Sequence, residues 1–195
     1  MSLKKPMDDL QITDPQTMRA LAHPVRLAAL SYLQAHGPAT ATQLAEHVGA
    51  SPSVTSWHLR HLEGFGLVTD VDPSEVGGDR RQRYWRAMQR GFSVEMSEEP
   101  ESQAAGSALM YELFATAEAQ LSRWLAETEP RLEPQWRRVG GPSNSTVTVT
   151  PDELDALQQQ IITALAAYAR RDPAEVPEGA RPVRVLHMYL PEVAP

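Results

Sequence analysis

The residues best suited to chemistry in this 195-residue chain are arginines, serines and a tryptophan in two short stretches. SPSVTSWHLRHLEGFGLV, residues 51–68, sets a stacking ring and a fixed cation among leucines. GGDRRQRYW, residues 77–85, places Arg80, Arg81 and Arg83 at or just after a glycine pair. Hydroxyl, indole and guanidinium groups are the donors and stacking surfaces that meet base edges and phosphates. The two stretches together indicate a nucleic-acid-binding surface.

The first stretch predicts an amphipathic helix. Ser51 before Pro52 is a start signal, and Gly64 and Gly66 are stop signals. At about 100° per residue, one side is apolar and the other is polar. The side expected to pack inward carries Thr55, His58, Leu59 and Leu62. The residues expected to contact nucleic acid are Ser51, Ser53, Val54, Ser56, Trp57, Arg60 and His61.

Roles within this candidate surface differ by residue type. Arg60 suits a guanine or phosphate contact, and Ser53 and Ser56 suit phosphate or base edges near the helix start. Trp57 could have either of two roles. It could contact a sugar or a thymine methyl, or it could pack on the first helix. The arginines of the second stretch suit phosphate or minor-groove contact. The alternative for both stretches is a solvated surface of an ordinary helix and hairpin.

The elements that would position these residues follow a recognisable order. Cap-and-proline or turn signals delimit four helices, at residues 14–22, 24–37, 40–49 and 51–64. Two strand-like runs follow, 66–71 and 81–88, joined by turn formers at 72–80. Four helices and then a hairpin is the order of a winged helix-turn-helix. The predicted organisation is an arm at 1–13, this domain at 14–92, a linker at 93–103 and a further region at 104–195.

The region after residue 103 predicts two long helices, 104–127 and 152–171, each with an apolar stripe of heptad-like spacing. The stripes are Met110, Leu113, Phe114, Ala117, Leu121 and Trp124, and Leu154, Leu157, Ile161, Leu165 and Tyr168. Such stripes favour a homodimer, and the alternative is that they pair within one chain. The runs 145–150 and 183–190 alternate as strands do and predict a small two-stranded sheet. The expected fold class is therefore mainly α (α+β), a winged helix-turn-helix followed by a helical dimerisation region with that sheet.

Composition and charge narrow the function classes. The net charge is −7, but residues 1–92 carry +1 with five of the six histidines, and residues 93–195 carry −8. Because local patches decide nucleic-acid contact, the total does not exclude it. The chain has no cysteine, no membrane-length apolar window and no signal-peptide core, which favours a cytoplasmic protein.

The search for catalytic and metal-binding patterns gives no candidate. Nucleophile elbows, phosphate-binding loops and metalloprotease motifs are absent from the sequence, so no enzyme and no cofactor are expected. Thiolate metal sites are impossible without cysteine. His58 and His61 are three residues apart but are expected to point in different directions, so no metal site is predicted.

Residues 14–88 resemble the arsenic-repressor (ArsR-type) winged helix-turn-helix transcription regulators. The resemblance rests on MRALAHPVRLAALSYL, TATQLAEHVGASPSVTSWHLRHLEGFGLV and GGDRRQRYWRAM. It implies that residues 40–49 and 51–64 form the helix-turn-helix, with the second helix entering the major groove of DNA. The family usually has an aliphatic residue at the position of Thr55 and a small polar one at that of Val54, so the resemblance implies the fold here but does not assign the side chains that read bases.

The expected function is a homodimeric, sequence-specific regulator of double-stranded DNA, a repressor by resemblance, with no membrane association. The alternative is a ligand-binding or protein-interaction module that keeps the winged helix without reading DNA. Trp136, Met110 and Met188 could line a pocket for a small apolar effector. The alternative for those three residues is that they pack a small core.

Overall fold

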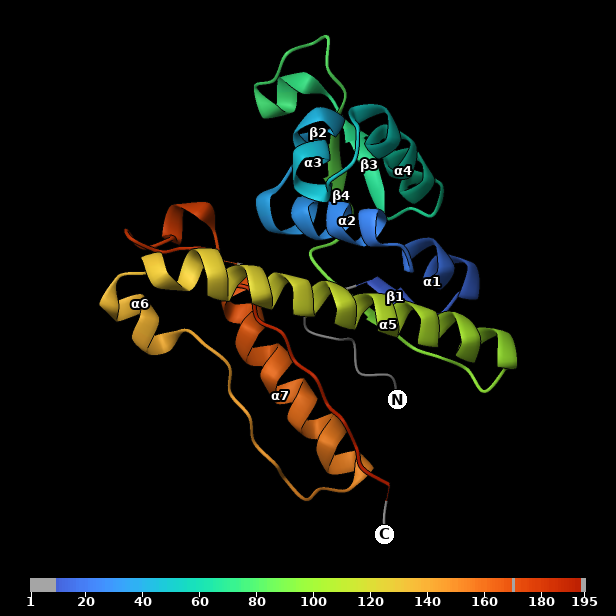
Figure 1. The fold of residues 1–195 in the computed structure, drawn as a ribbon, viewed down its shortest axis with the longest axis vertical. Coiled ribbons are helices and arrows are strands. Elements are labelled where there is room, and N and C mark those ends of the chain that lie inside the picture. The colour runs from blue at the N-terminus through green and yellow to red at the C-terminus, as the bar shows by residue number, and fades with distance from the viewer. Residues whose placement is uncertain (1–9, 170, 194–195) are drawn as a thin grey trace.

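The computed structural model describes residues 10–169 and 171–193 of the chain. A winged-helix domain, blue to green in Figure 1, stands on one side of a long helix, and a smaller helical region lies on the other side. The mainly-α class with a winged helix-turn-helix and a following helical region is confirmed. No helix among the described residues has the length and apolar content that a membrane crossing requires.

Four helices form the first part of the domain, α1 (Pro15–Leu21), α2 (Pro24–His36), α3 (Ala41–Val48) and α4 (Pro52–Gly64). Their starts are set locally. Asp14 caps α1 by accepting from the Thr17 N–H at 2.8 Å. Thr40 and Gln43 form a reciprocal capping box at the start of α3. These local hydrogen bonds explain why the sequence delimits the helices correctly.

The wing is built on a three-stranded sheet in the order β2–β4–β3. Its strands are β2 (Ala39–Thr40), β3 (Val68–Val71) and β4 (Tyr84–Ala87), all antiparallel to their neighbours. The register places Asp70 opposite Trp85. A 3-10 helix, Pro73–Val76, occupies part of the connection between β3 and β4. The predicted hairpin is present, with β2 as a third strand.

One apolar core joins the helices to this sheet. It is made by leucines of α2, α3 and α4 together with Trp85, whose side chain is 1% exposed. Leu109 of the long helix α5 (Pro100–Arg123) belongs to the same core. The C-terminal region is therefore attached to the winged helix by buried apolar contact.

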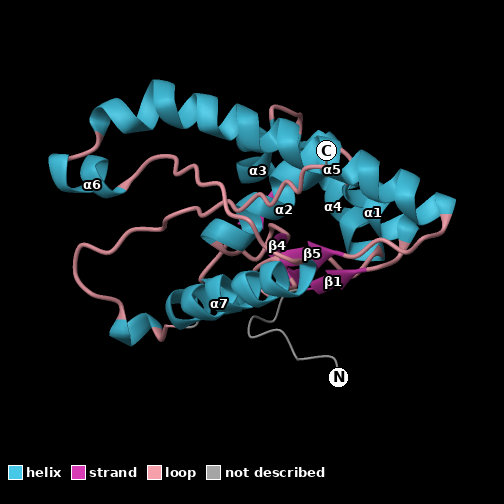
Figure 2. Cartoon of the chain, turned by 90° about the horizontal axis from the view of Figure 1, so that it is seen from below, coloured by secondary structure: helices cyan, strands magenta, loops and turns pink. Residues whose placement is uncertain are grey.

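The predicted N-terminal arm and linker contribute a strand each. β1 (Leu10–Ile12) pairs in parallel with β5 (Phe92–Val94), and the two lie side by side in Figure 2. Residues 1–9 of the arm lie outside the described residues. Within the residues 93–103 that were expected as a linker, β5 ends at Val94 and α5 begins at Pro100.

The C-terminal region continues from α5 into a π-helical turn, Trp124–Thr128, and a 3-10 turn, Glu129–Arg131. The short helix α6 (Pro134–Val139) and the helix α7 (Pro151–Ala169) follow. A second 3-10 turn, Pro173–Glu175, comes after α7. The two long helices were predicted within a few residues, whereas α6 was not predicted.

The two-stranded sheet predicted from residues 145–150 and 183–190 is absent from the structure. Neither run pairs with a neighbouring strand, and the two lie in the segments before and after α7 (Figure 1). Alternation creates a preference for a strand, but a strand forms only through a paired neighbour. The small two-stranded sheet of this fold is made by β1 and β5 instead.

Candidate nucleic-acid interface

The helix-turn-helix is formed by α3 and α4, joined by a turn of three residues. Gly49 ends α3 with φ 67°, a left-handed conformation that side chains other than glycine rarely adopt. Ser51 begins α4, and its hydroxyl accepts the Val54 N–H at 3.3 Å. The tight turn between these residues fixes the direction of α4 relative to α3.

The inward side of α4 is the predicted one, with Thr55, His58, Leu59 and Leu62 all buried. The Thr55 hydroxyl donates to the Ser51 carbonyl at 3.0 Å. Thr55 therefore satisfies its hydroxyl within the helix and still offers its methyl to the core, so a β-branched polar residue can take an aliphatic position.

The outward side of α4 offers both apolar and polar groups. The Trp57 side chain is 58% exposed and stacks on His61, with ring centroids 5.6 Å apart. Val54 is exposed near the start of the helix, as are Ser51 and Ser53. An exposed indole and a valine can contact thymine methyls or sugars, and serines can donate to phosphates.

Three arginines of this surface have no carboxylate partner within 4 Å among the described residues. Arg60 donates only to the Ser56 hydroxyl of its own helix, at 3.0 Å. Arg80 and Arg81 are exposed near the tip of the wing. Because their charges are not neutralised internally, all three can take an anionic ligand without breaking an ion pair.

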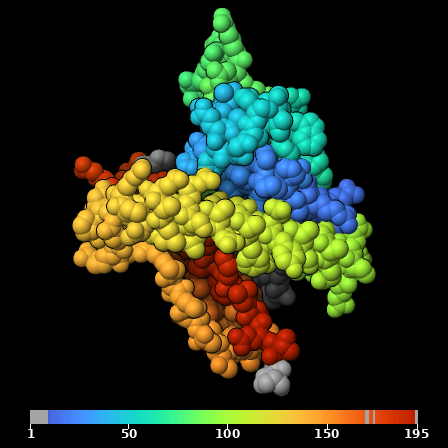
Figure 3. Space-filling model, viewed as in Figure 1, coloured from blue at the N-terminus to red at the C-terminus, as the bar shows by residue number. Residues whose placement is uncertain are grey.

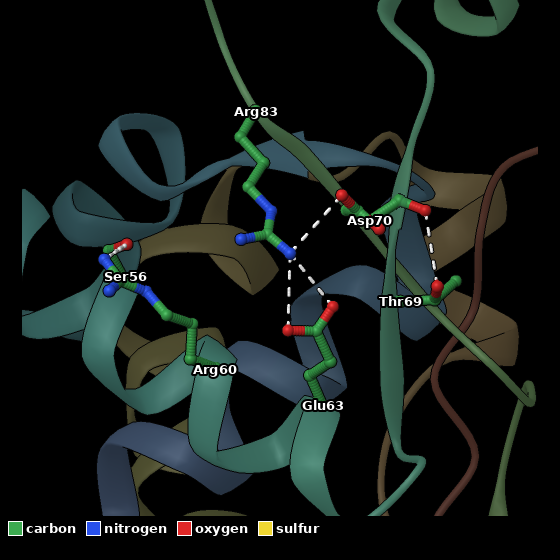
Figure 4. A network of polar contacts seen from close by, with 6 residues as sticks. All are labelled: Ser56, Arg60, Glu63, Thr69, Asp70 and Arg83. Atoms are coloured by element: carbon green, nitrogen blue, oxygen red, sulfur yellow. Dashed lines mark hydrogen bonds and ion pairs between the residues drawn. The ribbon is translucent and has the colours of Figure 1, made fainter.

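Arg83 differs from these three because it has acidic partners, which Figure 4 shows. Its Nη2 atom lies 3.0 Å from Glu63 Oε1 and 3.3 Å from Asp70 Oδ2. Its guanidinium also stacks over the Trp85 ring, 4.2 Å from the ring centroid. Glu63 lies in the last turn of α4 and Asp70 lies on β3, so Arg83 joins the wing to the helix. Its predicted phosphate contact would compete with two carboxylates.

The carboxylates of this junction were missed by the sequence analysis. Glu63 is 20 residues from Arg83, so no local spacing connects them. The sequence places Glu63 three residues after Arg60 on the helix, and Asp70 is exposed between the buried Val68 and Val71 of β3. Arg86 likewise has an acidic partner, Glu75, at 3.6 Å.

Histidines connect the outward side of α4 to the core behind it. His58 Nδ1 is buried without a hydrogen-bond partner, and the His58 ring lies 4.5 Å from that of His23, which caps α2. Burial lowers the pKa of His58, and the nearby His23 and Arg26 lower it further. Burial lowers the pKa of His23 too, against the opposing influence of Glu112. The folded protein therefore favours neutral rings at this contact.

In the described part of the chain, no three histidine or acidic side chains come close enough together to bind a metal ion. His61, for which a different direction from His58 was expected, stacks on Trp57. Burial also lowers the pKa of His61.

The predicted dimerisation residues separate into two groups. On α5, Met110, Phe114 and Leu121 are exposed, whereas Leu113 and Ala117 are half-buried. Trp124, the first residue after α5, is half-buried too. Leu125, which the sequence analysis did not include, extends the exposed group. On α7, Tyr168 is exposed, and the remaining stripe residues Leu154, Leu157, Ile161 and Leu165 are half-buried.

The residues considered for an effector pocket lie in different settings. Trp136, on α6, is covered by the Arg181 guanidinium 5.3 Å from its ring centroid, and Arg181 is held by Glu133. Met110 lies on the exposed side of α5, and Met188 is exposed on the extended run after α7. The indole is thus engaged by the protein's own side chains. The small apolar effector stays a prediction.

Comparison with known proteins identifies the domain. Residues 21–71, from α2 through β2, α3 and α4 to β3, match a family model described as a helix-turn-helix domain. The crystal structure of the YusO protein from Bacillus subtilis shares 21% identity, with 79% of this chain and 81% of that chain covered and a TM-score of 0.34. The search of curated proteins found no match. The chain therefore contains a helix-turn-helix domain.

Proposed function

We propose that this protein is a sequence-specific DNA-binding transcriptional regulator that acts as a homodimer and represses the genes it binds. The observation that carries the proposal is the exposed outward side of α4 beside a wing whose Arg80 and Arg81 have no acidic partner among the described residues. Residues 14–92 supply the reading domain, and residues 104–195 supply the dimerisation region. DNA as the target would place the protein in the cytoplasm.

The proposed contacts follow from chemistry and position. Arg60, Val54 and Trp57 would face base edges in the major groove, since they project from the helix that follows the tight turn. The hydroxyls of Ser51, Ser53 and Ser56 would contact phosphates or base edges near the helix start. His61 would support Trp57 through their stacking contact. Arg80 and Arg81 would contact phosphates or a narrow minor groove.

The homodimer and the repressor role rest on two further supports. A single winged helix covers few base pairs, and two-fold dimers match palindromic half-sites. The resemblance of residues 14–88 to ArsR-type regulators favours repression. No catalytic activity is part of the proposal.

The test is selection of bound sequences from random duplex DNA, repeated at two salt concentrations. We expect enrichment of a palindromic motif, with affinity that falls steeply as salt rises because phosphate contacts release counterions. The same selection with the Arg60→Ala variant should return a less defined motif. If no sequence is enriched at either salt concentration, the DNA-binding proposal is wrong, and a protein-interaction module is the better interpretation.

A further inference from the structure

Two large apolar side chains are exposed next to each other on α4. Val54 is 45% exposed and Trp57 is 58% exposed, and between residues 10 and 87 every other large apolar side chain is buried or half-buried. We call Val54 and Trp57 the apolar pair. Figure 3 shows the surface of α4, turquoise, near the projecting green wing, and the yellow to red C-terminal region does not cover it. One exposed apolar residue is ordinary, but two neighbours on one helix indicate a contact surface.

The apolar pair is continuous, and its ring is already held in place. Val54 and Trp57 are three positions apart on one helix, so their side chains are neighbours. The indole stacks on His61 with an angle of 18° between the ring planes, and it meets the buried His58 ring edge-on at 4.9 Å. A side chain held in this way loses little conformational entropy when a ligand packs against it. The pair is therefore prepared to accept an apolar group from outside the protein.

A cation lies beside the apolar pair. Arg60 has no carboxylate partner among the described residues, and its guanidinium folds back to donate to Ser56 Oγ at 3.0 Å (Figure 4). Ser56 and Trp57 are adjacent residues, about 1.5 Å apart along the helix axis. The guanidinium and the indole thus lie at nearly the same level of α4. Both are within reach of neighbouring base pairs, which are about 3.4 Å apart.

The two parts of this surface suit two different features of a base step. In the major groove, arginine recognises guanine through O6 and N7, and an apolar side chain recognises the C5 methyl group of thymine. A cytosine that is methylated at C5 carries the same methyl group at the same ring position. An apolar pair beside a guanidinium therefore fits a pyrimidine with a C5 methyl group next to a guanine.

From this arrangement, and resting on the proposed DNA-binding function, we infer that Val54 and Trp57 recognise the C5 methyl group of a pyrimidine beside a guanine that Arg60 contacts. Val54 and Trp57 are then specificity-determining residues that act by burying the methyl group. Val54 has no hydrogen-bonding side-chain group and no charge, so its contribution distinguishes bases by the methyl alone. This discrimination should not depend on salt, whereas the total affinity should, because phosphate contacts release counterions.

Removal of one methyl group from the DNA tests the contact. The probe is the duplex selected for this protein, with uracil in place of each thymine that adjoins a guanine, one position at a time. Uracil pairs as thymine does and lacks only the C5 methyl. At one of these positions the affinity should fall about fourfold, the factor that burial of one methyl group provides, and equally at low and high salt. If uracil has no effect at any position, the inference is wrong.

Methylated cytosine distinguishes the two sources of the methyl group. At the position where uracil weakens binding, a cytosine–guanine pair is compared with a 5-methylcytosine–guanine pair. Tighter binding of the methylated form, again by about fourfold, shows that either base can supply the methyl group. Equal affinity for the two cytosines, together with the uracil effect, shows that thymine is its source.

Truncation of the apolar pair should remove the discrimination. Val54→Ala and Trp57→Ala should each lower the ratio of thymine to uracil affinities toward one, because the partner of the methyl group is lost. Val54→Ala removes only two exposed methyl groups, so it decides the outcome even if Trp57→Ala binds too weakly to measure. The matched control is Val139→Ala, which shortens an exposed valine of α6 and should keep both the affinity and the ratio. A ratio near fourfold in both α4 variants overturns the inference.

These outcomes are separable from those of the proposed function. Circular dichroism checks that each variant is folded, and fluorescence anisotropy measures every affinity. A protein that binds its selected duplex and all the uracil forms equally well overturns this inference and leaves DNA binding intact. That result is also the one expected if Trp57 contacts a sugar. A protein that enriches no duplex overturns both proposals.

Discussion

The Arg83 guanidinium lies 3.0 Å from the Glu63 carboxylate, and this ion pair joins the residue just before β4 to the last turn of α4. Asp70 and the Trp85 ring complete its surroundings. Arg83 therefore serves a different purpose in this structure from Arg80 and Arg81, although all three lie within four residues of one another. Arg83 orients the wing, whereas Arg80 and Arg81 remain available to bind an anion.

This difference predicts distinct salt dependence for arginine variants. Arg80→Gln and Arg81→Gln should each weaken DNA binding at all sequences and reduce the slope of log affinity against log salt by about one, as loss of a phosphate contact does. Arg83→Gln should weaken binding without that change in slope, because it loosens the wing. Fluorescence anisotropy titrations over a salt series measure both quantities. An Arg83 variant that loses a full unit of slope would show that Arg83 leaves its carboxylates to bind phosphate.

Arg60 is expected to read sequence. Arg60→Ala should cost about 1–3 kcal/mol on the selected duplex and much less on an unrelated one, because a base contact exists only in the specific complex. Arg131→Ala is the matched control, since it removes an exposed arginine that lies outside the winged-helix domain and should leave the affinity for both duplexes unchanged. Competition binding with both duplexes measures the difference. Equal losses on both duplexes would make Arg60 a phosphate contact.

Thr55 offers a test of how α4 is held in the core. Thr55→Val should change the free energy of unfolding by less than about 1 kcal/mol, because the Ser51 carbonyl keeps its backbone hydrogen bond from the residue 55 N–H at 2.9 Å. Thr55→Ser should cost about 0.8 kcal/mol or more, since it removes a buried methyl and leaves a small void. Urea unfolding of the two variants measures this order. The reverse order would mean that the hydroxyl, and not the methyl, matters at this position.

The His23–His58 contact predicts acid sensitivity of the fold. The pKa of His58 and that of His23 are both lowered in the folded protein, chiefly by burial, with Arg26 contributing. The unfolded chain therefore binds more protons at low pH, and the unfolding free energy contributed by these rings is present above pH 6.5 and is lost as the pH falls below it. Urea midpoints between pH 8 and pH 5 should fall accordingly.

A substitution at His58 separates this contact from general acid effects. His58→Phe keeps a ring of similar size and removes a buried nitrogen that has no hydrogen-bond partner, so it should flatten the pH dependence without loss of stability at pH 8. His187→Phe, at an exposed position far along the chain, should leave the pH dependence as it was. A pH profile unchanged by His58→Phe would assign the acid sensitivity to other groups.

The exposed stripe of α5 shows where sequence periodicity is insufficient. The spacing from Met110 to Trp124 predicts one apolar stripe, but the structure divides it between a half-buried side and an open side. A helix with apolar residues around more than a third of its circumference can bury either part. Which part is buried depends on which other elements of the fold pack against the helix.

Local sequence signals were enough to predict the helix-turn-helix. Ser51 and Pro52 specify the start of α4, and the capping box of Thr40 and Gln43 specifies that of α3. These signals act over three or four residues, and the buried side of α4 follows from the period of the helix alone. The winged-helix class, the inward residues and the exposed candidates on α4 could therefore be read directly from the residues.

Contacts between distant residues were decided only by the tertiary structure. The Glu63 and Asp70 partners of Arg83, the pairing of β1 with β5, and the unpaired state of residues 145–150 and 183–190 all depend on which segments meet. Composition and alternation give a segment its preference for a strand or an ion pair, but they do not supply the partner. That partner is selected by the packing of the whole chain, because a strand or an ion pair is stabilised only when both members are present.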